Sequence, residues 1–297
     1  MAYAQVNGVN MYYETHGSGP PLALLHGGLS MIGLDFGALL PTLAGSHTVI
    51  GIEQQAHGHT ADVDRPLSFD AMTEGTSGLL RKLEVENADF LGYSMGGGIA
   101  VHVAIRHPEL VRKLVFVGGV AYSPDGYYPE LLAGMAHMKP EDLVGSPFHE
   151  AYVRNAPDPH GWTALVEKMK ELDLSWKGLT AEEVRSIQAP ALLVIGDADI
   201  VRPEHTVEMF RLLGGGVLGD FVGLPPSRLA VLPGSTHITV MQRTELLLSM
   251  VTEFLDAPIP RPGKIGSARY GVQEDGSTAT VPPSSTRTTP DPSGRIT

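Results

Sequence analysis

The sequence contains no cysteine among its 297 residues. This absence excludes disulfide bonds, thiolate nucleophiles and zinc sites with cysteine ligands. A chain without disulfides is consistent with the reducing cytoplasm, and we expect a cytoplasmic protein.

Positive charge is scarce as well. The chain has 21 lysine and arginine residues against 33 aspartate and glutamate residues, which gives a formal net charge of -12. A protein that binds nucleic acid needs surplus positive charge to neutralise phosphates. The composition therefore argues against a nucleic-acid partner.

Long apolar runs are also missing. No stretch reaches the roughly 18 consecutive apolar residues that a membrane-spanning helix requires. The N-terminal segment, MAYAQVNGVNMYYETHG, has no basic region followed by an apolar core. We expect neither a membrane span nor an export signal.

Short apolar segments and helical patterns alternate along the chain. The segments are rich in valine, isoleucine and leucine and are bounded by glycine, proline or asparagine, which is typical of buried strands. They read PLALLHG, HTVIGIE, ADFLGYS, KLVFVGG, PALLVIGD and RLAVLPG, and helical periodicity covers 71–84, 95–107, 204–213 and 241–255. This order predicts an α/β fold with a mostly parallel central sheet flanked by helices.

The alternation is interrupted between residues 121 and 188. This part has helical character without a convincing strand, and it holds both tryptophans, Trp162 and Trp176. We predict a core formed by 1–120 and 189–258, a helical cap formed by 121–188, and a disordered C-terminal tail from 259 to 297 that is rich in proline, serine and threonine.

One serine lies at the junction of a predicted strand and a predicted helix, in GYSMG. Glycines two positions before and after Ser94 allow a sharp turn that lifts the hydroxyl to the start of the helix. This G-x-S-x-G pattern is that of a nucleophile elbow. The alternative, in which Ser94 only caps the helix, does not explain glycines on both sides.

A serine nucleophile needs a base and a group that orients the base. His237 follows the last predicted strand, at the sheet edge where open α/β sheets bind ligands. The acid should also follow a strand, and GDADIVRP offers Asp197 and Asp199. The residues alone leave both aspartates open.

The elbow GYSMGG, together with LLHGGLS, GDADIVRP and PGSTHIT in this order, resembles the α/β-hydrolase superfamily over about residues 8–256. The resemblance is to esterase, lactonase and cofactor-free perhydrolase members with a helical cap. It implies that Asp199 is the acid, that Asp197 is a turn residue, and that no cofactor is needed.

The oxyanion formed by attack on a carbonyl requires two hydrogen-bond donors. The backbone N–H of Met95, directly after the serine, is one. The resemblance implies Gly28 as the second, with Leu29 as the alternative, and a structural role for His26. The HGH stretch from His57 to His59 suggests metal ligands, but no third ligand cluster is evident and we predict no metal site.

The predicted function is hydrolysis of a small-molecule carboxylic ester or lactone through an acyl-enzyme, with Ser94, His237 and Asp199 as the catalytic residues. Alternatives of the same fold are a perhydrolase, a carbon–carbon bond hydrolase of a dienone acid, or a receptor-like protein that binds its ligand with little turnover. For the dienone acid, Arg154 and Lys168 are candidates to hold the carboxylate only by location.

We expect an apolar pocket for small to medium acyl groups. Its predicted lining residues are Leu29, Met31, Met241 and Trp162. Methionine adapts to irregular shapes, so the methionines indicate a broad pocket, although they are equally consistent with ordinary core packing.

Overall fold

The structure, a computed structural model, describes residues 2–259. Nearly all of the predicted C-terminal tail, residues 260–297, lies outside the described residues. Residues 2–217 and 225–259 form one compact unit. The segment Leu218–Leu224, which contains the short helix α10 (Gly219–Val222), belongs to a second unit.

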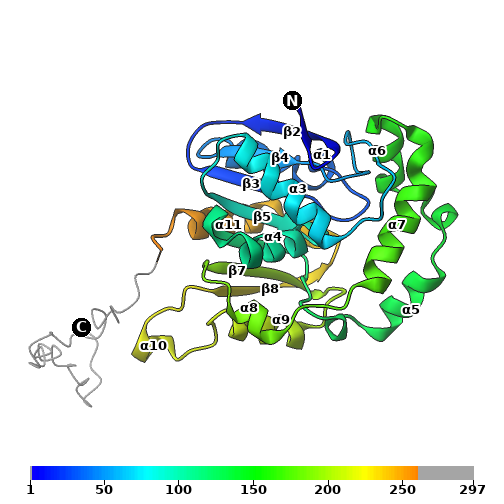
Figure 1. Cartoon of the computed structure of the whole chain (residues 1–297). Coiled ribbons are helices and arrows are strands. Elements are labelled where there is room, and N and C mark those ends of the chain that lie inside the picture. The colour runs from blue at the N-terminus through cyan, green and yellow to red at the C-terminus, as the bar shows by residue number, and fades with distance from the viewer. Residues whose placement is uncertain (1, 260–297) are drawn as a thin grey trace, which may run out of the picture. The chain divides into compact units, whose positions relative to one another are not determined.

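The centre of the first unit is an eight-stranded sheet of order β1-β2-β4-β3-β5-β6-β7-β8 (Figure 1). Strands β3 to β8 pair with one another in parallel, whereas β2 pairs antiparallel with both β1 and β4. The strands are β1 (Ala2–Val6), β2 (Val9–His16), β3 (Pro21–Leu25), β4 (Thr48–Ile52), β5 (Ala88–Tyr93), β6 (Val111–Val117), β7 (Ala191–Ala198) and β8 (Arg228–Thr236). The predicted α/β class with a mostly parallel sheet is confirmed.

Helices cover both faces of this sheet. The α-helices of the unit are α1 (Ile32–Phe36), α2 (Leu40–Leu43), α3 (Phe69–Lys82), α4 (Met95–Arg106), α5 (Pro129–His137), α6 (Pro147–Asn155), α7 (Trp162–Ser175), α8 (Ala181–Arg185), α9 (Pro203–Leu212) and α11 (Thr244–Asp256). Short 3-10 turns are η1 (Pro108–Leu110), η2 (Pro124–Gly126), η3 (Pro140–Leu143), η4 (Pro159–Gly161) and η5 (Thr239–Gln242).

Successive side chains of the central strands enter two different cores. In β6, Leu114 and Phe116 pack into the cluster that includes α3 and α4, whereas Val115 and Val117 pack into the cluster that includes α1 and α11. This alternation follows from the two-residue repeat of a strand. Because both faces are covered, the strand sequences are apolar almost without interruption.

The β1–β2 hairpin was not predicted. It turns at Asn7 and Gly8, which have φ values of 49° and 83°. Two residues with positive φ are typical of the tight turn that joins two antiparallel strands, and asparagine followed by glycine is its common sequence. The polar positions that alternate with apolar ones in these strands make them resemble loop segments.

The last helix is attached to the sheet by a buried lysine. Lys113 on β6 donates hydrogen bonds to the carbonyl oxygens of Phe254 at 3.0 Å, Leu255 at 2.5 Å and Ala257 at 2.5 Å. These carbonyls are at the C-terminus of α11, where a positive charge is stabilised by the helix dipole. Burial lowers the pKa of Lys113.

Residues 118–190, all of them described, connect β6 to β7 through helices and turns. Helices α5, α6 and α7 gather at one side of the sheet in Figure 1. The one strand-like contact of this segment is an isolated bridge between Tyr127 and Val201. The predicted helical cap, 121–188, falls within this segment.

Candidate active site

Ser94 lies at a strained turn between β5 and α4. Its φ of 52° and ψ of -118° are unusual for a residue with a side chain. A Cβ atom at Gly92 would lie 2.4 Å from the Gly96 carbonyl oxygen, and one at Gly96 would lie 2.0 Å from that of Leu25. The glycines are therefore needed for the close approach of strand and helix.

Ser94, His237 and Asp199 form one chain of hydrogen bonds. His237 Nε2 lies 2.8 Å from Ser94 Oγ, and His237 Nδ1 lies 2.8 Å from Asp199 Oδ1. The three residues follow β5, β8 and β7, so the carboxyl ends of parallel strands bring them to the same edge of the sheet. With Nδ1–H donated to the carboxylate, Nε2 accepts the serine proton.

The Asp199 carboxylate is buried and held by backbone N–H groups. Ile200 and Val201 donate to Oδ1 at 2.7 and 3.4 Å, and Gly119 donates to Oδ2 at 3.1 Å. Burial alone would raise the pKa of Asp199, but the hydrogen bond and charge of His237, together with these N–H groups, lower it below its usual range. The group is therefore ionised at neutral pH.

Asp197 has a different environment. It is exposed and accepts a hydrogen bond from the backbone N–H of Ser235 at 3.1 Å. Among the described residues, no hydrogen bond joins it to His237. The structure thus places Asp199, and not Asp197, beside the histidine.

Tyr93 contacts both the backbone and the ring of His237. Its hydroxyl donates to the backbone oxygen of His237 at 3.1 Å, and the two rings stack with centroids 5.3 Å apart. Sequence reasoning missed this residue and Gly119. For Gly119 the signal was a glycine pair at the end of a strand, and a Cβ atom there would lie 2.5 Å from Val201 Cβ and 3.0 Å from Asp199 Oδ1.

The loop after β3 is braced from two sides. His26 donates from Nδ1 to the Gly27 carbonyl at 2.8 Å and accepts at Nε2 from the Gln54 N–H at 3.1 Å. Burial, followed by the nearby His57, lowers the pKa of His26 to about 3. The ring is therefore neutral, as its two hydrogen bonds require.

The second brace of this loop is Asp35 on α1, which sequence reasoning missed. Its carboxylate accepts from the Gly27 N–H at 2.8 Å and from Ser30 Oγ at 2.6 Å. Between these two points Leu29 adopts a φ of 59°. Burial raises the pKa of Asp35 to about 6. No sequence motif marks this aspartate, because its role depends on tertiary contact.

A cavity of about 260 Å³ opens at Ser94. The predicted residues Gly28, Leu29, Ser94 and Met95 line it. Three predicted pocket residues, Met31, Met241 and Trp162, are not among its lining residues, so the pocket differs from the prediction in these positions.

Each of the three residues packs elsewhere. Met31 is buried at the start of α1, and Met241 packs against the core cluster that includes α11. Trp162 is buried against Tyr152 and donates from its ring nitrogen to the Pro140 carbonyl at 3.3 Å. Trp162 therefore belongs to the internal packing of the 118–190 segment.

Other residues of the same segment form the cavity wall instead. The aromatic ones are Tyr127 and Trp176, and the methionines are Met135, Met138 and Met169. Met135 comes from α5, Met138 directly follows that helix, and Met169 comes from α7. Helical periodicity alone could not tell which face of each helix meets the cavity.

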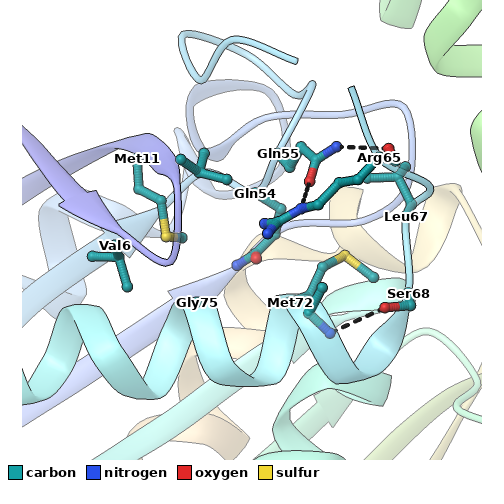
Figure 2. A pocket seen from close by; sticks show the side chains of 11 residues that line it. Val6, Met11, Gln54, Gln55, Arg65, Leu67, Ser68, Met72 and Gly75 are labelled. Atoms are coloured by element: carbon teal, nitrogen blue, oxygen red, sulfur yellow. Dashed lines mark hydrogen bonds between the residues drawn. The ribbon is translucent and has the colours of Figure 1, made fainter. Parts of the chain in front are cut away.

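A second, much smaller cavity lies between the β1–β2 hairpin and α3 (Figure 2). Its volume of about 10 Å³ admits about one water molecule. Gln55 closes it: its side chain accepts from Arg65 Nε at 2.7 Å and donates to the Arg65 carbonyl at 3.2 Å. These contacts of Gln55 fix the loop that follows β4.

The HGH stretch is also occupied by structural contacts. His57 donates from Nδ1 to the Gln55 carbonyl at 2.8 Å, whereas His59 contacts the buried Glu53 at 2.9 Å. In residues 2–259, no group of three or more histidine, aspartate or glutamate side chains is arranged to hold a metal ion.

Residues 20–244 match the model of the alpha/beta hydrolase fold family, and the chain belongs to this family. It is 26% identical over 279 residues to a 2-hydroxymuconate semialdehyde hydrolase of Pseudomonas sp. (strain CF600), covering 84% of this chain and 91% of that protein. It is also 26% identical over 245 residues to a pimeloyl-[acyl-carrier protein] methyl ester esterase of Neisseria meningitidis, covering 74% of this chain and 87% of that protein.

Among solved structures, the enol-lactonase from Burkholderia xenovorans LB400 superposes with a TM-score of 0.63 at 21% identity, covering 86% of this chain and 100% of the other. This likeness confirms the α/β-hydrolase fold. Across residues 2–259, no helix is both long enough and apolar enough to cross a membrane.

Proposed function

We propose that the chain hydrolyses carboxylic esters or lactones through an acyl-enzyme, with Ser94 as the nucleophile. The observation that carries this proposal is the hydrogen-bonded chain from Ser94 Oγ through His237 to Asp199, with 2.8 Å at each step, beside a cavity of about 260 Å³. The relatives named esterase and enol-lactonase support the same reaction class.

In the first half of the reaction, His237 takes the Ser94 proton as the oxygen attacks the substrate carbonyl. Asp199 keeps the histidine in the required tautomer and stabilises its positive charge. The developing oxyanion accepts from the backbone N–H of Met95 at the start of α4 and from the N–H of Gly28 or Leu29. His237 then returns the proton to the leaving alcohol.

In the second half, water replaces the alcohol. His237 takes a proton from the water, which attacks the acyl-enzyme carbonyl, and the same N–H groups hold the second oxyanion. Collapse of this intermediate returns the proton to Ser94 and releases the acid. No cofactor takes part in these steps.

The wall of the cavity favours neutral or cationic substrates over carboxylates. Its ionisable carboxyl, Asp173, would repel a substrate carboxylate. Lys170 donates to the Met138 carbonyl at 3.2 Å and lies 3.8 Å from Glu167, while Lys168 is paired with Asp62 at 2.6 Å. These contacts argue against hydrolysis of a dienone acid, whose carboxylate needs a free cation.

The test uses p-nitrophenyl esters from acetate to palmitate and an acyl-homoserine lactone, with wild type, Ser94→Ala and the control Ser249→Ala on the exposed surface of α11. We expect hydrolysis of the short and medium esters by wild type and by Ser249→Ala, and loss of at least about 10³-fold in Ser94→Ala.

Parallel reactions address the other chemistries. They contain peroxide with acetate, and a dienone acid. Turnover of the dienone acid without ester hydrolysis would replace the proposal with carbon–carbon bond cleavage. Equal inactivity of wild type and Ser94→Ala on every acyl substrate would remove the hydrolase proposal and favour a ligand-binding role.

A further inference from the structure

One carboxyl group in the cavity has no hydrogen-bond partner. Asp173 lies in the last turn of α7 and lines the same cavity as Ser94. Among residues 2–259, no side chain or backbone N–H donates to its carboxylate. Burial, the single cause, raises the pKa of Asp173 to about 7. Asp173 is partly exposed, and its exposed part faces the cavity, so its unpaired carboxylate is available to a ligand.

Neighbouring groups leave this carboxylate uncompensated. Lys170, one turn earlier on α7, is bound to the Met138 carbonyl. The other titratable groups that line the cavity are Tyr127 and His102, and burial lowers the pKa of His102 so that its ring is neutral. Lys170 is thus the cation among the described lining residues, and its ammonium is bonded to the Met138 carbonyl and not to Asp173.

Aromatic rings and the helix end both favour a cation at this point. Trp176 follows Asp173 by three residues and lines the cavity together with Tyr127 and Phe69. Aromatic faces attract ammonium groups. The last turn of α7 also presents the negative end of its helix dipole. An anionic ligand would be repelled by the carboxylate and by the helix end, and a neutral one would lack the charge attraction.

We propose that Asp173 binds a protonated amine carried by the substrate, so that the preferred esters or lactones are cationic. This inference rests on the proposed function and specifies its substrate class. The ammonium N–H groups supply the hydrogen bonds that the carboxylate lacks, and the surrounding rings replace part of the water lost on binding.

The kinetic test compares esters that differ only in charge. The pairs are p-nitrophenyl 6-aminohexanoate with heptanoate and 8-aminooctanoate with nonanoate, in which an ammonium replaces a methyl group. For wild type we expect kcat/KM to be about tenfold higher for the amino ester of at least one pair at pH 8. In Asp173→Asn this ratio should fall by at least about tenfold.

Glu171→Gln is the matched control, because it removes one carboxylate from the exposed surface of the same helix. We expect its ratio to equal that of wild type. In wild type the ratio should rise as the pH passes through about 7, because Asp173 ionises there. A ratio of one, or one that Asp173→Asn leaves unchanged, overturns the inference.

A binding measurement keeps this inference distinct from the proposed function. Calorimetric titration of Ser94→Ala with n-hexylammonium chloride does not depend on turnover. We expect saturable binding that Asp173→Asn weakens by at least about tenfold, and weaker binding of 1-hexanol. Amine binding without hydrolysis by wild type would refute the ester reaction and retain the site. Hydrolysis of neutral esters without amine binding would retain the ester reaction and refute the amine site.

Discussion

The carboxylate of Asp35 accepts a hydrogen bond from the backbone N–H of Gly27 at 2.8 Å. The same carboxylate accepts from Ser30 Oγ at 2.6 Å, so one side chain holds both ends of the turn that contains Gly28 and Leu29. The N–H groups of that turn are the proposed oxyanion donors. We infer that Asp35 is a positioning residue for the proposed reaction.

Removing this brace should slow the chemical step. In Asp35→Ala we expect kcat to fall by about tenfold to a hundredfold with KM changed less than threefold, because a displaced donor weakens the transition state more than substrate binding. The measurement is steady-state kinetics on a p-nitrophenyl ester. Asp64→Ala, an exposed aspartate without side-chain hydrogen bonds, is the control. A change confined to thermal stability would make Asp35 merely structural.

The two aspartates after β7 should respond very differently to the same substitution. Asp199→Asn should lower kcat by roughly 10³-fold to 10⁴-fold, because an amide stabilises neither the required tautomer nor the charge of His237. Asp197→Asn should retain most of the activity, since its partner is the Ser235 N–H. Ester kinetics of the two variants decide the point, and equal losses would contradict it.

Asp173 should reduce stability at high pH. Its pKa is about 7 in the folded chain and about 3.8 when unfolded. A raised pKa contributes stability below the unfolded value, and this contribution is lost as the pH rises through 7. Relative to Asp173→Asn, wild type should therefore lose about 1 kcal/mol of unfolding free energy per pH unit between pH 4 and 7. Urea titrations of both proteins measure it, and parallel pH profiles would exclude a perturbed Asp173.

Met169 should limit the length of the acyl group. It lies on α7 in the cavity wall, and its Cε atom would be 2.7 Å from a Cβ atom placed on Gly28. Met169→Ala should shift the preferred p-nitrophenyl ester by about two carbons toward longer chains, at a cost of about 2 kcal/mol in stability. The chain-length profile checks the prediction, and an unchanged optimum would place the acyl group elsewhere.

Lys113 should matter for stability and not for substrate selection. Lys113→Met keeps the apolar stem but leaves the carbonyls of Phe254, Leu255 and Ala257 without their donor. We expect a loss of about 2 kcal/mol in urea unfolding with an unchanged ester profile. Lys177→Met, an exposed lysine, is the control and should be neutral. A shifted ester profile would show that α11 influences the cavity.

The sequence predicted the parallel part of the sheet well because β3 to β8 are buried on both faces and their apolar runs stand out. It also indicated Ser94, since the demand for glycines at 92 and 96 is local to the turn. Sequence reasoning could propose His237 and Asp199 for a related reason: residues that follow parallel strands meet at one edge of the sheet.

The rest depends on tertiary contacts that periodicity does not contain. Trp162 and Trp176 lie at the two ends of α7, yet only Trp176 reaches the cavity. Tyr93 reaches His237 through one hydrogen bond across 144 positions, and Asp35 reaches back from α1 to the turn after β3. Such pairs become visible only when the chain is folded.

The position of His237 after β8 has a consequence for how activity is lost. β8 is the terminal strand of the sheet and pairs only with β7 among the described strands. Ser94 and His237 are 143 positions apart, so their contact persists only while this edge strand stays docked. Edge strands are prone to local opening without global unfolding. Mild denaturant should therefore abolish hydrolytic activity before the helices unfold. A nascent chain should become active only after this last strand joins the sheet.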